Sequence, residues 1–361
     1  MIISIYSTQI IATVPNPEGY TGLEYVVGLL CKYIDEETDH TLYLFATEDS
    51  YVPKKKDSYL FSIGKAGAVN PLEAFKQYWK DERSRRALME SDIVCDHSWG
   101  YYPYAVADKL KNVMHVHHGC DPGWRTPPPI DKPCLCTVGF QLARRFQEMT
   151  GLEWRTVHNG IDISRYPYKK DKEDYLLFVG RLYEFKAPHR FVKICNEMKE
   201  KGILIGGSFG DNPAYQKMIK DMCDKSPYVE FLGEVPFEKK VELMQNAKAV
   251  IVPNVYRLPL KDRPNEYGFF PEPFGIVPVE ANACGTPVIS SPIYGLTETL
   301  IHGYNGFHAN SDEEFKYYIK RIDEIKPENC RRLVEEVFDY RRMAREYLRL
   351  FEEIVVNKNR W

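Results

Sequence analysis

Residues 271–290 read PEPFGIVPVEANACGTPVIS and predict a loop, a helix, a turn and a strand in that order. Gly275 lets the backbone approach a ligand closely, and Pro278 is tolerated in the first turn of a helix. The run Gly285-Thr286-Pro287 ends the helix before an apolar strand that starts at Val288. Because the N-terminus of a helix offers free N–H groups and a positive dipole end, the segment predicts a site for an anion such as a diphosphate.

Two glutamates belong to this segment: Glu272 precedes the predicted helix and Glu280 lies on it. Carboxylates accept hydrogen bonds from hydroxyl groups, and sugar rings carry hydroxyls in adjacent pairs. An anion site with two carboxylates beside it therefore predicts a ligand that contains both phosphate and sugar. The alternative is that Glu280 is a solvated helix carboxylate and Glu272 an ordinary acid at a helix start, and their spacing alone would favour that interpretation.

The segment resembles the E-x7-E motif of the retaining glycosyltransferases of family 4, which have the GT-B fold, and the two glutamates match its two acids. Further motifs of that family, each weak alone, follow in the family's order along nearly the whole chain. They are Gly22 after the first strand, Asn159-Gly160-Ile161-Asp162, Gly180-Arg181-Leu182 with Lys186, and Phe231-Leu232-Gly233. Their order and spacing together make the resemblance specific.

The length of 361 residues exceeds that of a typical single domain and therefore predicts a two-domain globular protein. A net charge of −3 gives no sign of a nucleic-acid partner. The nine cysteines lack metal-binding spacing and no signal-peptide pattern opens the chain, so we expect a reduced, cytoplasmic protein. No apolar run reaches membrane-spanning length, so any membrane contact would be peripheral, at the cytoplasmic face.

Strand and helix patterns alternate from a strand at 2–6 to one at 154–157, and the alternation starts afresh at 175–179. This α/β pattern predicts two doubly wound, Rossmann-like domains, each with a mostly parallel sheet covered by helices on both faces. Single long helices are predicted at 71–89 and 311–325.

The charged stretch 169–174 places the domain boundary near residue 165. The resemblance implies that residues 1–165 bind the acceptor, that 166–338 bind the nucleotide-sugar donor, and that the two domains face each other across a cleft. Residues 339–361 contain a helix with an apolar stripe, which the resemblance places across the domain junction.

The resemblance also implies roles for residues of the second domain. Arg181 and Lys186 flank its first strand-to-helix turn and would hold the diphosphate and assist its departure, because fixed cations stabilise the developing charge. Glu272 would bond donor-sugar hydroxyls, and Glu280 would bond the ribose. The remaining substrate-binding candidates of this domain are Val235, Phe274, Gly275 and Ile276.

In the first domain, Gly22 is either an ordinary helix-start glycine or a close backbone contact for the phosphates. His118 matches the acceptor-side histidine of the family and could bond a sugar hydroxyl when neutral. His97 ends another strand and is a second substrate-binding candidate, with core packing equally open. His115 and His117 share one strand face that could hold a metal, but no further ligand cluster accompanies them and we predict no metal site.

We predict a retaining glycosyltransferase that moves a hexose from a UDP- or GDP-type nucleotide sugar to a hydroxyl of a sugar, glycolipid or other small acceptor. We expect no cofactor and no metal, because the sequence lacks the Asp-x-Asp pair of metal-dependent glycosyltransferases. No side chain is an obvious nucleophile, which favours a front-face displacement. A nucleotide-sugar epimerase of the same fold and a non-catalytic nucleotide-sugar binding protein are the alternatives. The oligomeric state and the role of residues 256–267 are not predicted.

Overall fold

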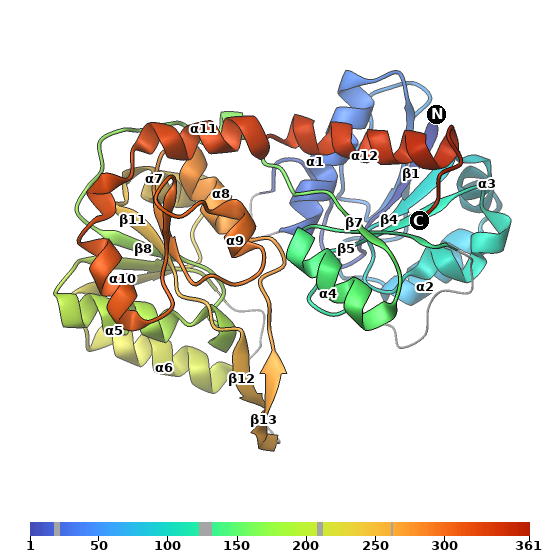
Figure 1. Cartoon of the computed structure of the whole chain (residues 1–361). Coiled ribbons are helices and arrows are strands. Elements are labelled where there is room, and N and C mark those ends of the chain that lie inside the picture. The colour runs from blue at the N-terminus through green and yellow to red at the C-terminus, as the bar shows by residue number, and fades with distance from the viewer. Residues whose placement is uncertain (18–21, 123–131, 208–211, 261–262) are drawn as a thin grey trace. The chain divides into compact units, whose positions relative to one another are not determined.

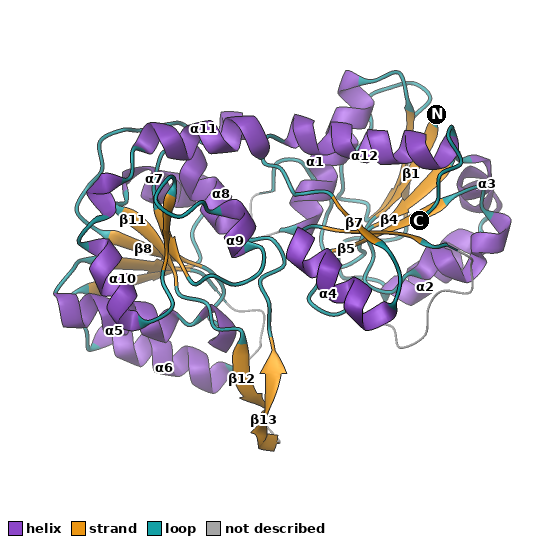
Figure 2. Ribbon diagram, viewed as in Figure 1, coloured by secondary structure: helices purple, strands orange, loops and turns teal. Residues whose placement is uncertain are grey.

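The structure is a computed structural model, and it describes residues 1–17, 22–122, 132–207, 212–260 and 263–361. The chain divides into two compact units, Met1–Ile161 with Tyr340–Trp361 and Asp162–Asp339. Each unit has a parallel sheet with helices on both faces (Figures 1 and 2), which confirms the predicted pair of doubly wound domains. The final helix belongs to the first unit, to which the chain returns at Tyr340.

The sheet of the first unit has seven parallel strands in the order β3-β2-β1-β4-β5-β6-β7. They are β1 (Ile2–Tyr6), β2 (Thr41–Ala46), β3 (Tyr59–Ser62), β4 (Ile93–Asp96), β5 (Val113–His117), β6 (Cys134–Thr137) and β7 (Trp154–Thr156). Apolar residues such as Ile3, Leu42 and Val94 are fully buried, as parallel strands between two helix layers require. The edge strand β3 was not predicted, because four residues with two exposed side chains give a weak pattern.

The helices of this unit are α1 (Leu23–Glu37), α2 (Pro71–Lys80), α3 (Glu82–Glu90), the 3-10 helix η1 (Tyr102–Lys109), α4 (Phe140–Thr150) and α12 (Tyr340–Val355). The single helix predicted at 71–89 is wrong. The backbone is extended at Asp81, whose carboxylate accepts a hydrogen bond of 2.8 Å from the N–H of Ser84. The chain therefore breaks at Asp81, and this residue caps α3.

The apolar stripe predicted in the last helix is buried within the first unit. Met343, Tyr347 and Phe351 of α12 are at most 2% exposed, and the helix packs against α1. The ring of Tyr340 stands edge-on to Tyr33 of α1, with ring centres 6.5 Å apart. Because α12 supplies part of this unit's core, the first unit is incomplete without the end of the chain. Its predicted passage across the junction stays a prediction.

The second unit has a six-stranded parallel sheet in the order β10-β9-β8-β11-β14-β15. The strands are β8 (Leu176–Val179), β9 (Gly202–Ile205), β10 (Val229–Gly233), β11 (Ala249–Val252), β14 (Val288–Ser290) and β15 (Gly306–His308). The helices are α5 (Pro188–Met198), α6 (Pro213–Asp224), α7 (Phe237–Asn246), α8 (Ile276–Ala283), α9 (Leu296–Thr299), α10 (Asp312–Ile319) and α11 (Pro327–Val337), with short 3-10 turns η2 (Ile163–Arg165), η3 (Glu184–Lys186) and η4 (Ile322–Glu324). The helix predicted at 311–325 is thus two elements, α10 and η4, while α8 and β14 confirm the opening segment.

Residues 256–267, whose role the sequence left open, contribute to an antiparallel hairpin of β12 (Arg257–Leu260) and β13 (Arg263–Phe269). Figure 1 shows this hairpin standing apart from the six-stranded sheet of its unit. At its base, Phe270 stacks on Phe185 with ring centres 6.0 Å apart. The hairpin is therefore anchored beside η3, which carries Lys186.

Candidate active site

Two glycines allow close packing of the backbone at the start of α8. Gly275, the N-cap, has a φ of 86°, a left-handed conformation that favours glycine, and a Cβ there would lie 2.7 Å from Leu296 Cδ2. A Cβ on Gly295 would lie 2.4 Å from the Cα of Phe274, and the Gly295 N–H donates to the Glu272 carbonyl at 3.0 Å. The loop from Glu272 to Gly275 is therefore fixed against the turn at Gly295.

The predicted candidates in this loop have different surroundings. The Phe274 side chain is buried and its ring stands edge-on to Phe338 at 5.8 Å, so only its backbone is suited to touch a ligand. Ile276 is half-buried in the first turn of α8, beside the N–H groups that would hold an anion.

Glu272 is the centre of a polar cluster. Its Oε2 accepts a hydrogen bond of 2.8 Å from Nδ2 of Asn254 and forms an ion pair with the ammonium group of Lys186. Lys186 ends η3, and the next residue, Ala187, has a left-handed φ of 51° that turns the chain into α5. The two residues predicted to act on the donor thus lie in direct contact, from segments 86 positions apart in the chain.

Glu280 forms a second, more deeply buried cluster on α8. Its Oε1 accepts hydrogen bonds from the Tyr166 hydroxyl and from Lys240 Nζ, each of 2.7 Å. The Glu280 side chain is only 6% exposed, so a cation beside it is needed to offset the cost of burying its charge. The solvated alternative for this residue is therefore wrong.

Arg181 lies two residues after the end of β8. A glycine follows β8 and β9, and the neighbouring strand β10 ends in Gly233. The guanidinium of Arg181 lies 5.7 Å from the centre of the Tyr183 ring. A Cβ on Gly206, which follows β9, would lie 1.8 Å from the Gly180 carbonyl oxygen, so the backbones approach closely here. Val235 is half-buried just after β10, at the same carboxyl edge of the sheet, where ligands of doubly wound folds bind.

In the first unit, His97 and His118 form a pair across neighbouring strand ends. Nδ1 of His97 lies 2.9 Å from Nε2 of His118. Burial lowers the pKa of His97 to about 3, and burial together with His97 lowers the pKa of His118 well below its usual value. Both rings are therefore neutral at pH 7, the form in which His118 could bond a hydroxyl.

On the strand face that carries His115 and His117, these two side chains and that of Asp96 form a row of hydrogen bonds. His115 Nδ1 lies 2.8 Å from Oδ2 of Asp96, and its Nε2 lies 3.4 Å from His117 Nδ1, so the predicted shared face is confirmed. Burial lowers the pKa of His117 to about 3. Among the residues that the structure describes, no group of three or more His, Cys, Asp or Glu side chains could hold a metal ion.

Gly22 is exposed at the start of α1, and a Cβ added there would meet nothing within 4 Å. Within the described part of the chain, no close contact therefore requires a glycine at position 22. Gly28 of α1 is the constrained one, because a Cβ would lie 2.3 Å from the Val14 carbonyl carbon. Gly28 is not among the residues predicted from the sequence, although a glycine within an apolar helical stretch was the available signal.

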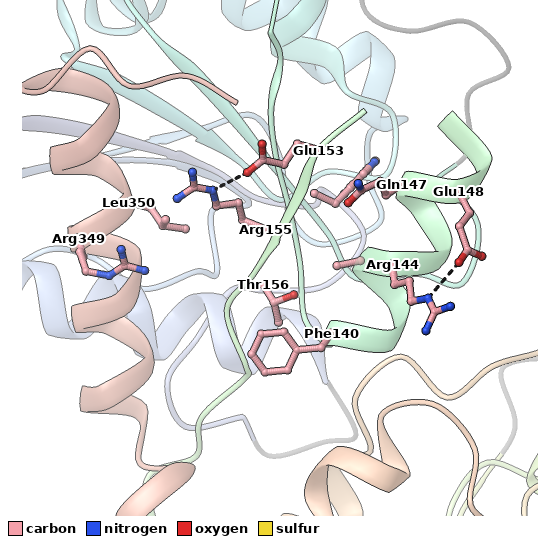
Figure 3. A pocket seen from close by; sticks show the side chains of 11 residues that line it. Phe140, Arg144, Gln147, Glu148, Glu153, Arg155, Thr156, Arg349 and Leu350 are labelled. Atoms are coloured by element: carbon pink, nitrogen blue, oxygen red, sulfur yellow. Dashed lines mark hydrogen bonds and ion pairs between the residues drawn. The ribbon is translucent and has the colours of Figure 1, made fainter. Parts of the chain in front are cut away.

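A pocket of about 810 Å³ lies in the first unit between α4, β7 and α12 (Figure 3). Its arginines are paired with glutamates: Arg155 Nε lies 3.2 Å from Glu153, and Arg144 Nε lies 3.0 Å from Glu148. The third arginine of the lining, Arg349, pairs with Glu353 of the same helix. No residue predicted for the active site lines this pocket, so it is separate from the clusters above.

All nine cysteines are free and eight of them are buried. Within the described ranges, no helix has the length and apolar character needed to span a bilayer.

A family model for glycosyl transferases group 1 matches residues 162–338, the range that holds both glutamate clusters. This unit of the chain belongs to the glycosyl transferases group 1. An uncharacterized glycosyltransferase of Methanocaldococcus jannaschii is 28% identical over 221 residues, which cover 55% of this chain and 52% of that protein. The chain thus spans about half the length of the curated relatives it matches.

Solved structures extend the likeness in fold to the whole chain. A glycosyltransferase involved in avilamycin A biosynthesis superposes with a TM-score of 0.72 at 20% identity, covering 98% of both chains. HepE of Anabaena, solved in complex with UDP, superposes with a TM-score of 0.69 at 16% identity, covering 98% of this chain and 100% of that one. At such identities the likeness establishes the predicted GT-B fold.

Proposed function

We propose that this glycosyltransferase transfers a hexose from a nucleotide diphosphate sugar to an acceptor hydroxyl, with retention and without a metal. The observation that carries the proposal is the contact of Lys186 and Asn254 with one oxygen of Glu272, just ahead of the glycine-capped start of α8. A cation, a carboxylate and a helix N-terminus together suit a ligand with both phosphate and sugar hydroxyls.

Each group has a distinct part in the proposed reaction. Arg181, Lys186 and the α8 N–H groups would stabilise the negative charge that develops on the diphosphate as its bond to the anomeric carbon breaks. Glu272 would accept hydrogen bonds from donor-sugar hydroxyls on the attacked face. The acceptor oxygen would bond to the anomeric carbon on the side that the phosphate leaves, and the leaving phosphate oxygen would take the acceptor proton.

Glu280 would bind the ribose of the donor. Lys240 and Tyr166 both contact Oε1 of its carboxylate, so they fix the orientation of the group before a ligand arrives. UDP- and GDP-type donors both carry a ribose, and the structure of HepE with UDP supports a uridine nucleotide as the first to test.

In the first unit, the neutral His118, held by His97, would bond a hydroxyl of a sugar, glycolipid or other small acceptor. Nine free cysteines suit a reducing compartment, so we place the reaction in the cytoplasm, with peripheral attachment to the cytoplasmic face of a membrane if the acceptor is a glycolipid.

A panel of nucleotide sugars and their nucleoside diphosphates, assayed by thermal shift, tests donor binding. A ligand that binds the folded chain stabilises it by RT ln(1 + [L]/Kd) and so raises the unfolding temperature. The donor that binds is then incubated with and without acceptor sugars. The proposal expects a new glycoside only when acceptor is present. An altered donor sugar without acceptor would indicate an epimerase, and binding without turnover would indicate a non-catalytic binding protein.

A further inference from the structure

Asn254 is a buried amide whose two polar ends differ in their partners. It follows β11 and is only 3% exposed. Its Nδ2 donates a hydrogen bond of 2.8 Å to Glu272 Oε2, whereas its Oδ1 is buried and has no partner among the residues that the structure describes. Buried polar atoms of native proteins nearly always have partners, so this oxygen requires an explanation.

Charge fixes which end of the Asn254 amide faces Glu272. A carbonyl oxygen turned toward the carboxylate would meet a second set of lone pairs, whereas the NH₂ group can donate to it. The amide oxygen is therefore held as an acceptor pointing away from Glu272. It can be satisfied only by a group that carries a proton, such as a hydroxyl.

The backbone around Asn254 is tied on both sides. Arg190 Nη1 donates to the Pro253 carbonyl at 2.8 Å, and the Val255 N–H donates to the Phe185 carbonyl at 2.8 Å. Arg190 is itself paired with Asp312 at 2.8 Å. Because hydrogen bonds hold the backbone on both sides of Asn254, the chain cannot readily turn the amide oxygen out toward water. The missing hydrogen-bond donor must therefore enter the buried position of this oxygen.

We propose that Asn254 binds the donor sugar: Oδ1 accepts a hydrogen bond from one ring hydroxyl, while Nδ2 positions Glu272. This inference rests on the proposed function and deepens it by assigning a residue to sugar selection. An amide oxygen and a carboxylate side by side select a neutral hexose that presents a hydroxyl, and they disfavour a sugar that is deoxygenated there.

The test compares Asn254→Ala with Asn310→Ala, an exposed asparagine of the same unit. For each variant, calorimetry gives the Kd of the nucleoside diphosphate, and kinetics give kcat/KM for the intact donor. Asn254→Ala should change the Kd of the nucleoside diphosphate by less than about twofold but lower kcat/KM by about tenfold or more, while Asn310→Ala changes neither.

Donors that each lack one ring hydroxyl separate a binding role from a structural one. With the donor that lacks the partner hydroxyl, Asn254→Ala should cause a clearly smaller loss than with the intact donor. The hydrogen bond to Oδ1 is then already absent, and only the contact of Nδ2 with Glu272 is removed. The same loss on every deoxy donor, a parallel loss of nucleoside diphosphate affinity, or wild-type kcat/KM in Asn254→Ala would overturn the inference. If the wild-type chain binds donors but transfers nothing, the proposed function fails first, independently of this variant.

Discussion

Lys186 and Glu272 form an ion pair in which the lysine ammonium group contacts Oε2, and neither side chain is more than 20% exposed. The family resemblance implies separate tasks for them, Lys186 on the diphosphate and Glu272 on the sugar. Their contact means that a donor phosphate that attracts Lys186 also changes the charge balance at Glu272. The two residues should therefore act as a coupled unit.

Replacing either predicted cation with methionine should slow the chemical step. We expect Arg181→Met and Lys186→Met each to lower kcat by about a hundredfold or more, the scale of losing one preorganised electrostatic contact. Lys193→Met is the matched control, since Lys193 lies 55% exposed on α5 and pairs with Asp312. Steady-state kinetics of the three variants would refute the assignment if all three behaved alike.

A double-mutant cycle tests the coupling itself. The combination of Lys186→Met with Glu272→Gln should lower kcat/KM by clearly less than the product of the two single losses, because each change already breaks the shared contact. Losses that simply multiply would show that the ion pair has no part in turnover.

Acid should destabilise the protein through its buried histidines. The pKa values of His97 and His117 are lowered to about 3 in the folded state, chiefly by burial, while an unfolded histidine titrates near 6.5. Between these values the unfolded chain binds more protons, so the free energy of unfolding falls as the pH falls, by up to about 1.4 kcal/mol per pH unit for each histidine. Urea unfolding between pH 6.5 and 5 measures this slope.

Two substitutions test whether His97 contributes to the pH dependence of the free energy of unfolding. His97→Asn should flatten the pH dependence of unfolding, whereas His302→Asn, at an exposed position, should leave it unchanged. Equal slopes in the wild-type protein and in His97→Asn would contradict the lowered pKa of His97.

Removing residues 340–361 should leave insoluble or aggregating protein. The truncation takes away the buried face of α12 and uncovers the apolar surface of α1 against which it packs. Expression and size-exclusion chromatography measure the outcome, with Arg349→Ala as a control that changes an exposed position of the same helix. A soluble and active truncated protein would show that α12 is dispensable.

Transfer should persist in excess chelator. The sequence has no Asp-x-Asp pair, and Arg181, Lys186 and the start of α8 are available to balance the charge of a diphosphate. The measurement is the transfer rate before and after EDTA treatment. Activity that disappears with EDTA and returns with Mg²⁺ or Mn²⁺ would show that a divalent ion takes part.

The sequence predicted the fold and the loop-helix-strand segment well, because these depend on local periodicity and on glycine and proline. The bounds of β1 and β2 and the position of α8 follow from such local patterns. The edge strand β3, by contrast, has too little apolar alternation to stand out.

The partners of the two glutamates could not be predicted in this way. Lys240 lies 40 positions from Glu280, and Tyr166 lies 114 positions from it, so only the folded sheet brings them together. Asn254 gave one usable signal, a polar residue directly after a buried strand. Its contact with Glu272, however, spans the hairpin between them and depends on tertiary structure.

The most direct test of this account is a titration of Glu272→Gln and Glu280→Gln with the nucleoside diphosphate, beside their transfer kinetics. Glu272→Gln keeps its shape but loses the charge-assisted bond to the sugar, so turnover should fall steeply while affinity for the nucleoside diphosphate stays near wild type. Glu280→Gln should weaken nucleoside diphosphate binding itself, because a ribose contact is present in donor and product alike. If Glu272→Gln lost that affinity as severely as Glu280→Gln, or if both kept full activity, the donor would not lie on this segment.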